Sequence, residues 1–131
     1  MCHMETVEFL ILKNLLHNEE YVRKVIPFIK GDYFEDMNQK IVFEEIIKFV
    51  QEYNQPATKE VLCIEAEKRQ DITDDSFKEI TQLISSLEEN DTEFEWLVNT
   101  TEKWCRDRAI YLALMESIHI ADGKDEKKNR D

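Results

Sequence analysis

The scarcity of turn-forming residues constrains this chain more than any other feature. Only two Gly and two Pro occur in 131 residues. A sheet-rich fold of this size needs more of them, because Gly and Pro supply the backbone angles of tight turns. The length suits one domain, since single domains commonly have about 100–150 residues. The sequence therefore predicts an all-α fold, a small bundle of about six helices ending in a long one.

Apolar residues recur at helical spacing in six segments, and most segments follow a residue that suits a helix N-cap. A side-chain oxygen at the N-cap accepts a hydrogen bond from a free backbone N–H of the first turn. The expected N-caps are Asn18, Asp36, Thr58, Thr73 or Asp74, and Thr92. We expect helices over about residues 4–17, 18–27, 36–53, 58–68, 73–87 and 92–121.

The last of these helices carries a seven-residue repeat. A repeat of this length is typical of a helix that lies lengthwise along another helix. Leu97, Trp104, Tyr111 and Ile118 form the repeat, with Thr101, Arg108 and Met115 interleaved.

Residues 109–115 of the same helix are seven consecutive apolar residues. A helix that is apolar on all sides has to be covered on more than one side. A partner helix or a second subunit provides such cover; the alternative is that this segment is the central core helix of a monomer. On spacing and excess apolarity we select as interface residues Leu97, Trp104, Arg108, Tyr111, Leu112, Met115 and Ile118.

The two ends of the chain differ from the middle. Residues 1–4, Met-Cys-His-Met, resemble a cloning scar and are left out of the functional interpretation. Residues 122–131 are almost all charged and have nothing to bury, so we expect a solvated, mobile tail that begins a linker. The helical domain is expected over residues 5–121.

The formal net charge is −12, from 29 acidic and 17 basic residues. This charge repels a phosphate backbone, so the chain is expected to bind nucleic acid poorly on its own. No stretch approaches the roughly 18 uninterrupted apolar residues of a membrane span, and the N-terminus has no signal-peptide pattern. We expect a soluble, intracellular protein without a membrane partner.

Catalytic and metal-binding motifs are missing from the sequence. There is no G-x-x-x-x-G-K-[ST] loop, so no ATP binding or hydrolysis is expected of this chain. Cys2, Cys63 and Cys105 lie far apart and form no zinc-ligand spacing. Glu116 and His119 give only half of a di-iron ligand pattern. We therefore expect no catalytic residue, no metal and no cofactor.

Residues 103–108 combine three cations with the indole of Trp104, a combination that also occurs where proteins stack on nucleic acid. Trp104 and Arg108 both fall on the seven-residue repeat. This position favours a packed ring, and a guanidinium paired with a carboxylate or with a partner's helix end.

Several stretches, in their order and spacing, resemble the N-terminal domain of T4-type bacteriophage replicative DNA helicases, which belong to the DnaB-like family of hexameric helicases. The resemblance spans most of the chain. It is carried by residues 21–27, 32–35, 43, 46–47, 52–53, 56, 58, 83–87, 96–98, 101–103 and 108–109.

The resemblance implies a helical collar above an ATPase ring. In this family the domain pairs between subunits through a helical hairpin, of which the long helix here would be the first arm. It also implies self-association in a hexamer, docking of primase, a helicase loader as a further partner, and the cytoplasm of an infected bacterium as location. ATP and Mg²⁺ would bind only in the motor domain, which this chain lacks.

Two other functions stay open on the sequence. The acidic balance also suits a free-standing helical protein that binds a basic partner, as an inhibitor or a nucleic-acid mimic. The Glu116–His119 pair also suits a small helical enzyme with a metal site, and elemental analysis for bound metal would test this third reading.

Overall fold

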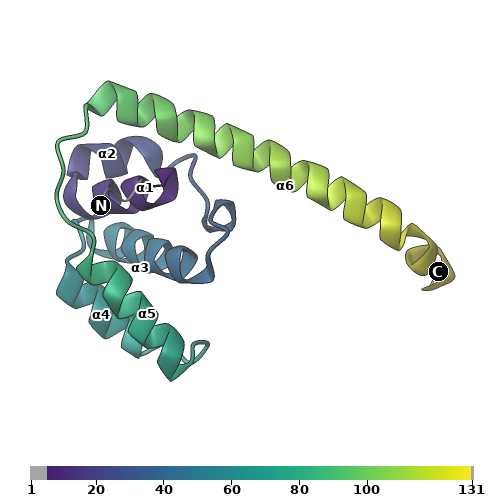
Figure 1. Cartoon of the computed structure of the whole chain (residues 1–131), viewed down its shortest axis with the longest axis horizontal. Helices are drawn as coiled ribbons and strands as arrows, with labels where there is room; N and C mark the ends of the chain where they lie inside the picture. The colour runs from purple at the N-terminus through teal and green to yellow at the C-terminus, as the bar shows by residue number, and fades with distance from the viewer. Residues whose placement is uncertain (1–5, 131) are drawn as a thin grey trace, which may run out of the picture.

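A computed structural model describes residues 6–130, with side chains through residue 119. This part of the chain contains six α-helices, one turn of 3-10 helix and no strand (Figure 1). The all-α prediction is confirmed. The elements are α1 (Val7–His17), α2 (Glu19–Val25), η1 (Gly31–Tyr33), α3 (Met37–Tyr53), α4 (Lys59–Glu67), α5 (Asp74–Ser85) and α6 (Phe94–Arg130).

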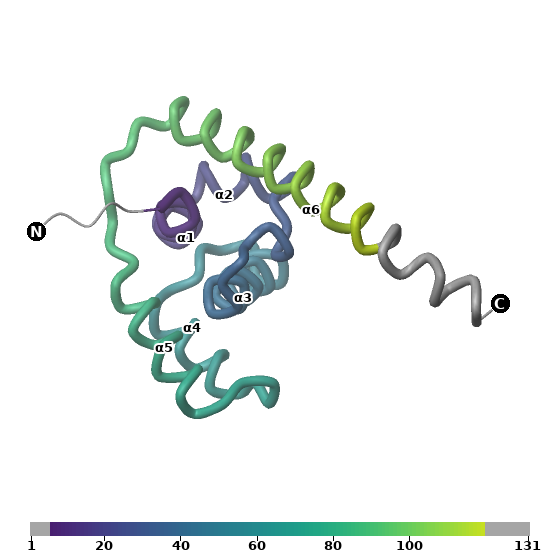
Figure 2. The backbone as a smooth tube through the Cα atoms, turned by 45° about the vertical axis from the view of Figure 1, so that its right-hand side comes forward, coloured from purple at the N-terminus to yellow at the C-terminus, as the bar shows by residue number. Residues whose placement is uncertain are grey.

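The helices stack in layers. α1 packs against α2, α3 and α6, and α3 packs in turn against the α4–α5 pair. α6 crosses the top of this stack over α1, α2 and η1 and then extends well beyond it, as two views show (Figures 1 and 2). The molecule therefore consists of a helical body and a projecting helix. We call the described residues through 108 the body, and residues 109–119 the arm.

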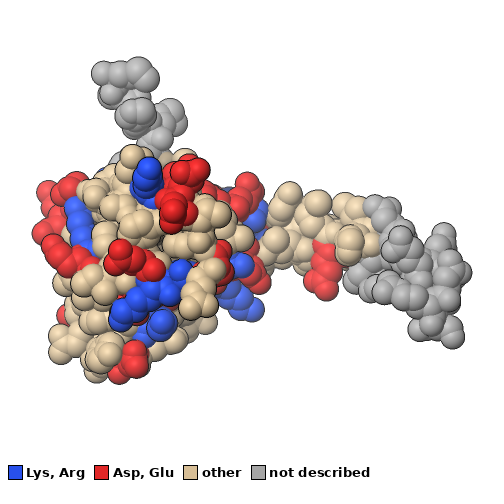
Figure 3. Space-filling model, turned by 90° about the horizontal axis from the view of Figure 1, so that it is seen from below, with Lys and Arg blue, Asp and Glu red and all other residues tan. Residues whose placement is uncertain are grey.

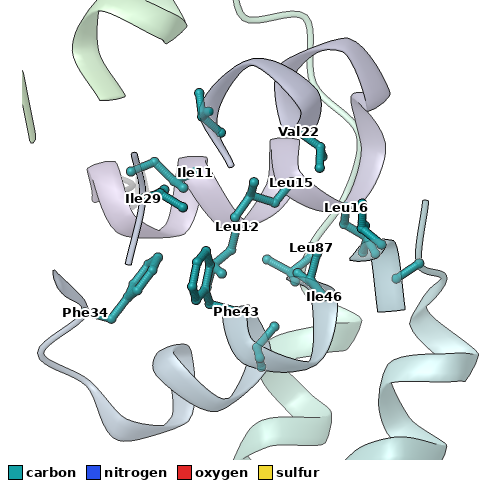
Figure 4. Close-up of a cluster of buried hydrophobic side chains, with 14 of the residues drawn as sticks. Ile11, Leu12, Leu15, Leu16, Val22, Ile29, Phe34, Phe43, Ile46 and Leu87 are labelled. Carbon is teal, nitrogen blue, oxygen red and sulfur yellow. The ribbon is translucent and has the colours of Figure 1, made fainter. Parts of the chain in front are cut away.

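α1 lies at the centre of the body. Its residues Ile11, Leu12 and Leu15 are fully buried, and they converge with side chains of α3 and with Leu87 (Figure 4). Burying one such side chain contributes roughly 1.5–3 kcal/mol relative to exposing it. Asn14 is the buried polar residue of this helix, and its side-chain amide donates to the Leu10 carbonyl at 3.0 Å. α1 is a core helix, as its apolar spacing predicted.

Four helix starts confirm the predicted N-caps. The side chains of Asn18, Asp36, Thr58 and Thr73 each accept a hydrogen bond from a backbone N–H of the following turn, at 2.9–3.2 Å. Asn54 caps the C-terminal end of α3, with a left-handed φ of 53° that an Asn tolerates better than most residues. Polar side chains thus fix where the short helices begin.

The start of α6 corrects the sequence prediction by one residue. Glu93, rather than Thr92, accepts the N–H groups of Glu95 and Trp96, both at 2.9 Å. These two backbone hydrogen bonds lower the pKa of the Glu93 carboxyl, because they stabilise its charged form. A carboxylate also interacts favourably with the positive end of the helix dipole, which a Thr hydroxyl does much less.

The far end of α6 is at Arg130 instead of near Ala121, where the sequence analysis placed it. Lys, Glu and Arg in residues 122–130 are good helix formers, so a charged composition does not require a break. The expected solvation of residues 122–131 concerns side chains outside the described part. The suspected scar at 1–4 also lies outside the described residues.

Arg69 links α4 and the loop after it to α3. Arg69, after α4, donates to Glu45 of α3 at 2.7 Å and to Asp71 at 2.7 and 2.9 Å. These carboxylates raise the pKa of Arg69, and the bond from Arg69 lowers the pKa of Asp71. Glu45 is buried, so its charge depends on this partner. The contact fixes α4 and the following loop against α3.

We predict that Arg69→Ala lowers the free energy of unfolding by about 2–3 kcal/mol, because it leaves the buried Glu45 carboxylate with only the exposed Lys48 ammonium, 3.8 Å away. Chemical denaturation followed by circular dichroism measures this loss. The neighbouring Lys68→Ala removes only an exposed ion pair to Glu65 and should cost less than about 1 kcal/mol. Equal losses in the two variants would contradict the role assigned to Arg69.

Candidate interaction surface

The first half of α6 is part of the body's own core. Leu97 is 1% exposed, and Thr101 is fully buried. The Thr101 hydroxyl lies 2.6 Å from the Tyr21 hydroxyl and donates to the Leu97 carbonyl at 2.8 Å. Leu97, which the sequence analysis grouped with the interface residues, is therefore covered by the chain's own body.

Trp104 packs over the segment that joins η1 to α3. Its ring centroid lies 5.0 Å from that of Phe34 and 6.0 Å from that of Tyr33, the latter edge to face. Phe34 in turn contacts Phe43 of α3 at 5.2 Å. The half-buried indole therefore anchors α6 to the body, which confirms the packed ring expected from the repeat. Its Nε1 is buried and has no hydrogen-bond partner.

Arg108 occupies the joint where α6 leaves the body. Its Nε donates to the Tyr33 carbonyl at 2.6 Å and its Nη1 to the Glu35 carboxylate at 3.1 Å. The central carbon of its guanidinium lies over the Tyr111 ring, 4.9 Å from the ring centroid. One side chain thus joins η1, the following loop and the first turn of the arm. The expected pairing of Arg108 with a carboxylate is confirmed.

The arm carries large apolar side chains that no described part of the chain covers. Their exposed fractions are 55% for Ile110, 47% for Tyr111, 58% for Leu114, 45% for Met115 and 53% for Ile118. On the face shown in Figure 3 the described part of the arm has very few charged groups, whereas the body has many. Such a continuous exposed apolar surface is typical of a site of association.

The structure divides the predicted interface residues into two groups. The group on or in the body comprises Leu97, Trp104 and Arg108. The group on the arm comprises Tyr111, Leu112, Met115 and Ile118, of which Leu112 is partly buried against the core. One stripe of α6 is therefore covered by the body in its first half and uncovered in its second.

Ile110 and Leu114 are exposed arm residues that the predicted set omitted. They lie four residues apart, off the seven-residue repeat, and so on another side of the helix. The signal that could have found them was the unbroken apolar run over residues 109–115, which points to cover on more than one side. The arm is consequently wider as a candidate surface than the repeat alone indicates.

Two titratable groups with strongly shifted pKa values, Cys105 and Tyr21, lie in the core. Burial raises the pKa of the Cys105 thiol to about 12, which keeps it protonated and weakly nucleophilic at neutral pH. Burial likewise raises the pKa of Tyr21.

Within residues 6–119 no three His, Cys, Asp or Glu side chains gather as metal ligands, and Glu116 and His119 are both exposed. In that same stretch no helix has the length and apolarity to cross a membrane.

We predict that Arg108→Ala loosens the joint. Loss of its bonds to Tyr33 and Glu35 should cost about 1–2 kcal/mol locally, so amides of residues 110–115 should exchange hydrogen about 5–30 times faster. Hydrogen exchange followed by mass spectrometry measures this rate. Arg106→Ala is the matched control, since Arg106 is an exposed arginine of the same helix. If the amides of residues 110–115 exchange at the same rate in both variants, the Arg108 contacts do not hold the base of the arm.

No protein-family model matches the sequence. The chain is 31% identical over 124 residues to the DnaB-like replicative helicase of Enterobacteria phage T4, a match that covers 92% of this chain. It covers 26% of that helicase, so the chain spans about a quarter of the relative's length. The resemblance drawn from the sequence is confirmed: along nearly its whole length this chain is related to part of a DnaB-like replicative helicase.

Proposed function

We propose that this chain is the non-catalytic N-terminal domain of a phage replicative DNA helicase, and that it serves hexamer assembly and primase docking through its arm. The observation that carries the proposal is the exposed apolar surface of residues 109–119, next to a body whose hydrophobic core is complete without these residues. A body with its own core does not need these side chains for folding. Their exposure costs solvation free energy that only association recovers.

The size of the apolar surface fits association with a second arm better than with a small ligand. Burying the exposed half of one large apolar side chain contributes on the order of 1 kcal/mol, so the five of one arm contribute roughly 5 kcal/mol. Two arms in a symmetric pair contribute about twice that. Because association itself costs about 4–15 kcal/mol, a pair of arms is favourable mainly when further contacts add to it, as in a larger assembly.

The relationship to a DnaB-like replicative helicase supports the assignment to DNA replication. The relative is much longer than the matched region, so we assign ATP binding with Mg²⁺, ATP hydrolysis and strand translocation to other parts of a longer protein. The protein would act in the cytoplasm of an infected bacterium, where the template, primase and a helicase loader are its partners.

The charge of this chain supports a role in protein contacts over DNA contacts. A net charge of −12 removes the electrostatic attraction that provides most non-specific DNA binding. The arm, by contrast, needs no charge to associate. Primase and a second subunit are both suited to an apolar helical surface of this kind.

We predict that Ile118→Asp in the full-length helicase weakens assembly at least about tenfold, since a carboxylate buried in an apolar contact costs well over 1.4 kcal/mol. Sedimentation velocity measures the hexamer, and fluorescence anisotropy with labelled primase measures docking.

The matched control is Met37→Asp at the start of α3. Met37 is 62% exposed and Ile118 is 53% exposed, so both variants place a carboxylate at an exposed apolar position. The control should assemble like the unaltered protein. If both variants assemble and bind primase equally well, the arm does not have the proposed role.

A further inference from the structure

A second candidate surface lies on the body, between α3 and α4. The two helices form a groove of about 230 Å³, whose walls come from the last turns of α3 and from α4. Pockets for small molecules usually have about 300–1,000 Å³, so this groove suits one or two side chains of a protein partner better than a cofactor.

The floor of the groove is apolar. Phe49 and Tyr53 of α3 stack with ring centroids 4.8 Å apart, and Val61 and Ile64 of α4 face them across the groove. Tyr53 is 58% exposed, and Ile64 more than half exposed. Large aromatic and aliphatic side chains that share one depression are what a buried apolar anchor of a partner requires.

The rim of the groove is acidic. Glu45, Glu52 and Glu65 line it together with one cation, Lys48. The Lys48 ammonium lies 3.8 Å from Glu45 and 3.9 Å from Glu65, so it is shared between the two walls. Glu52 makes no ion pair with any described residue. Glu45 is also bound by Arg69 at 2.7 Å, and Glu65 by Lys68 at 3.0 Å, so Glu52 is the lining carboxylate to which the described residues supply no cation.

The acidic character extends beyond the rim. Residues 44–69 contain six Glu, three Lys and one Arg. The second of these lysines, Lys59, is bound to Glu88 at 2.9 Å and to the Ser85 carbonyl, away from the groove. A partner that brings lysine or arginine to this surface therefore gains complementary charge, and an acidic partner is repelled.

We propose that the α3–α4 groove binds a basic amphipathic helix of another protein. One large apolar side chain of that helix seats between Tyr53 and Ile64, and a flanking lysine or arginine pairs with Glu52. The Arg69 network holds α4 against α3 and so keeps the groove open in the free protein. This surface is separate from the arm and does not depend on the function proposed for the arm.

The test uses the 131-residue chain and a synthetic amphipathic peptide, with leucines on one face and lysines and arginines on the other. Nuclear magnetic resonance should show amide shifts confined to the second half of α3 and to α4. Ile64→Ser should weaken binding at least about tenfold, because the anchor loses its apolar contact. Met37→Ser, which also removes an exposed apolar side chain but at the first residue of α3, should leave binding unchanged.

Charge variants separate the groove from the overall acidity. Glu52→Lys should weaken binding of the peptide several-fold, while Asp91→Lys in the loop before α6 alters the net charge equally and should have little effect. A peptide with serines in place of leucines, or with glutamates in place of its cations, should not bind the groove.

Three results would overturn the proposal. The first is a set of peptide shifts on the arm or spread over the acidic surface. The second is equal binding of the serine or glutamate peptide. The third is a dependence of the groove's amide shifts on protein concentration without peptide, which would identify a second copy of this chain as the occupant.

Discussion

The length of α6 relative to the body is the constraint on which the rest of the structure depends. A helix of 37 residues is on the order of 55 Å long. The body, residues 6–108, has 103 residues, and a compact body of that size has a radius of gyration of only about 13 Å. The body can therefore cover the first part of α6, where Leu97 and Thr101 are buried, but not the part that carries Ile110 and Leu114. The division between core and arm follows from this mismatch.

Two arginines fix the orientation of α4 and of the base of the arm relative to the rest of the body. Arg108 is nearly buried and connects the base of the arm to η1 and Glu35, while Arg69 connects α4 to the buried Glu45. Each is a planar donor with several partners, so each sets an orientation as well as a distance. The apolar core makes the body compact, and these two polar contacts determine how its exposed surfaces are presented.

The sequence predicted most of the fold because local signals dominate a helical chain. Asn18, Asp36, Thr58 and Thr73 were identified as caps since the capping bond joins residues only two or three apart. Thr92 and Glu93 are adjacent, so residue spacing alone does not show which of them caps α6. The backbone geometry of the first turn places the Glu93 carboxylate at the free N–H groups.

The candidate surfaces were less predictable than the helices. The seven-residue repeat in α6 identified one side of the helix but not the point at which the body stops covering it, so Leu97 and Ile118 were given the same role. The groove was not foreseen, because Tyr53 and Ile64 belong to different helices and only the packing of α4 on α3 brings them together. The hexamer and the primase remain predictions from family resemblance.

The projection of the arm also affects how two such acidic molecules can approach each other. From Arg108 to His119 the arm extends on the order of 16 Å. Mobile ions screen charges over about 8 Å at physiological ionic strength. Two chains joined lengthwise and antiparallel through their arms would hold their bodies apart by roughly twice the screening length. An apolar contact can therefore form at the end of a molecule whose net charge of −12 would otherwise keep its copies apart.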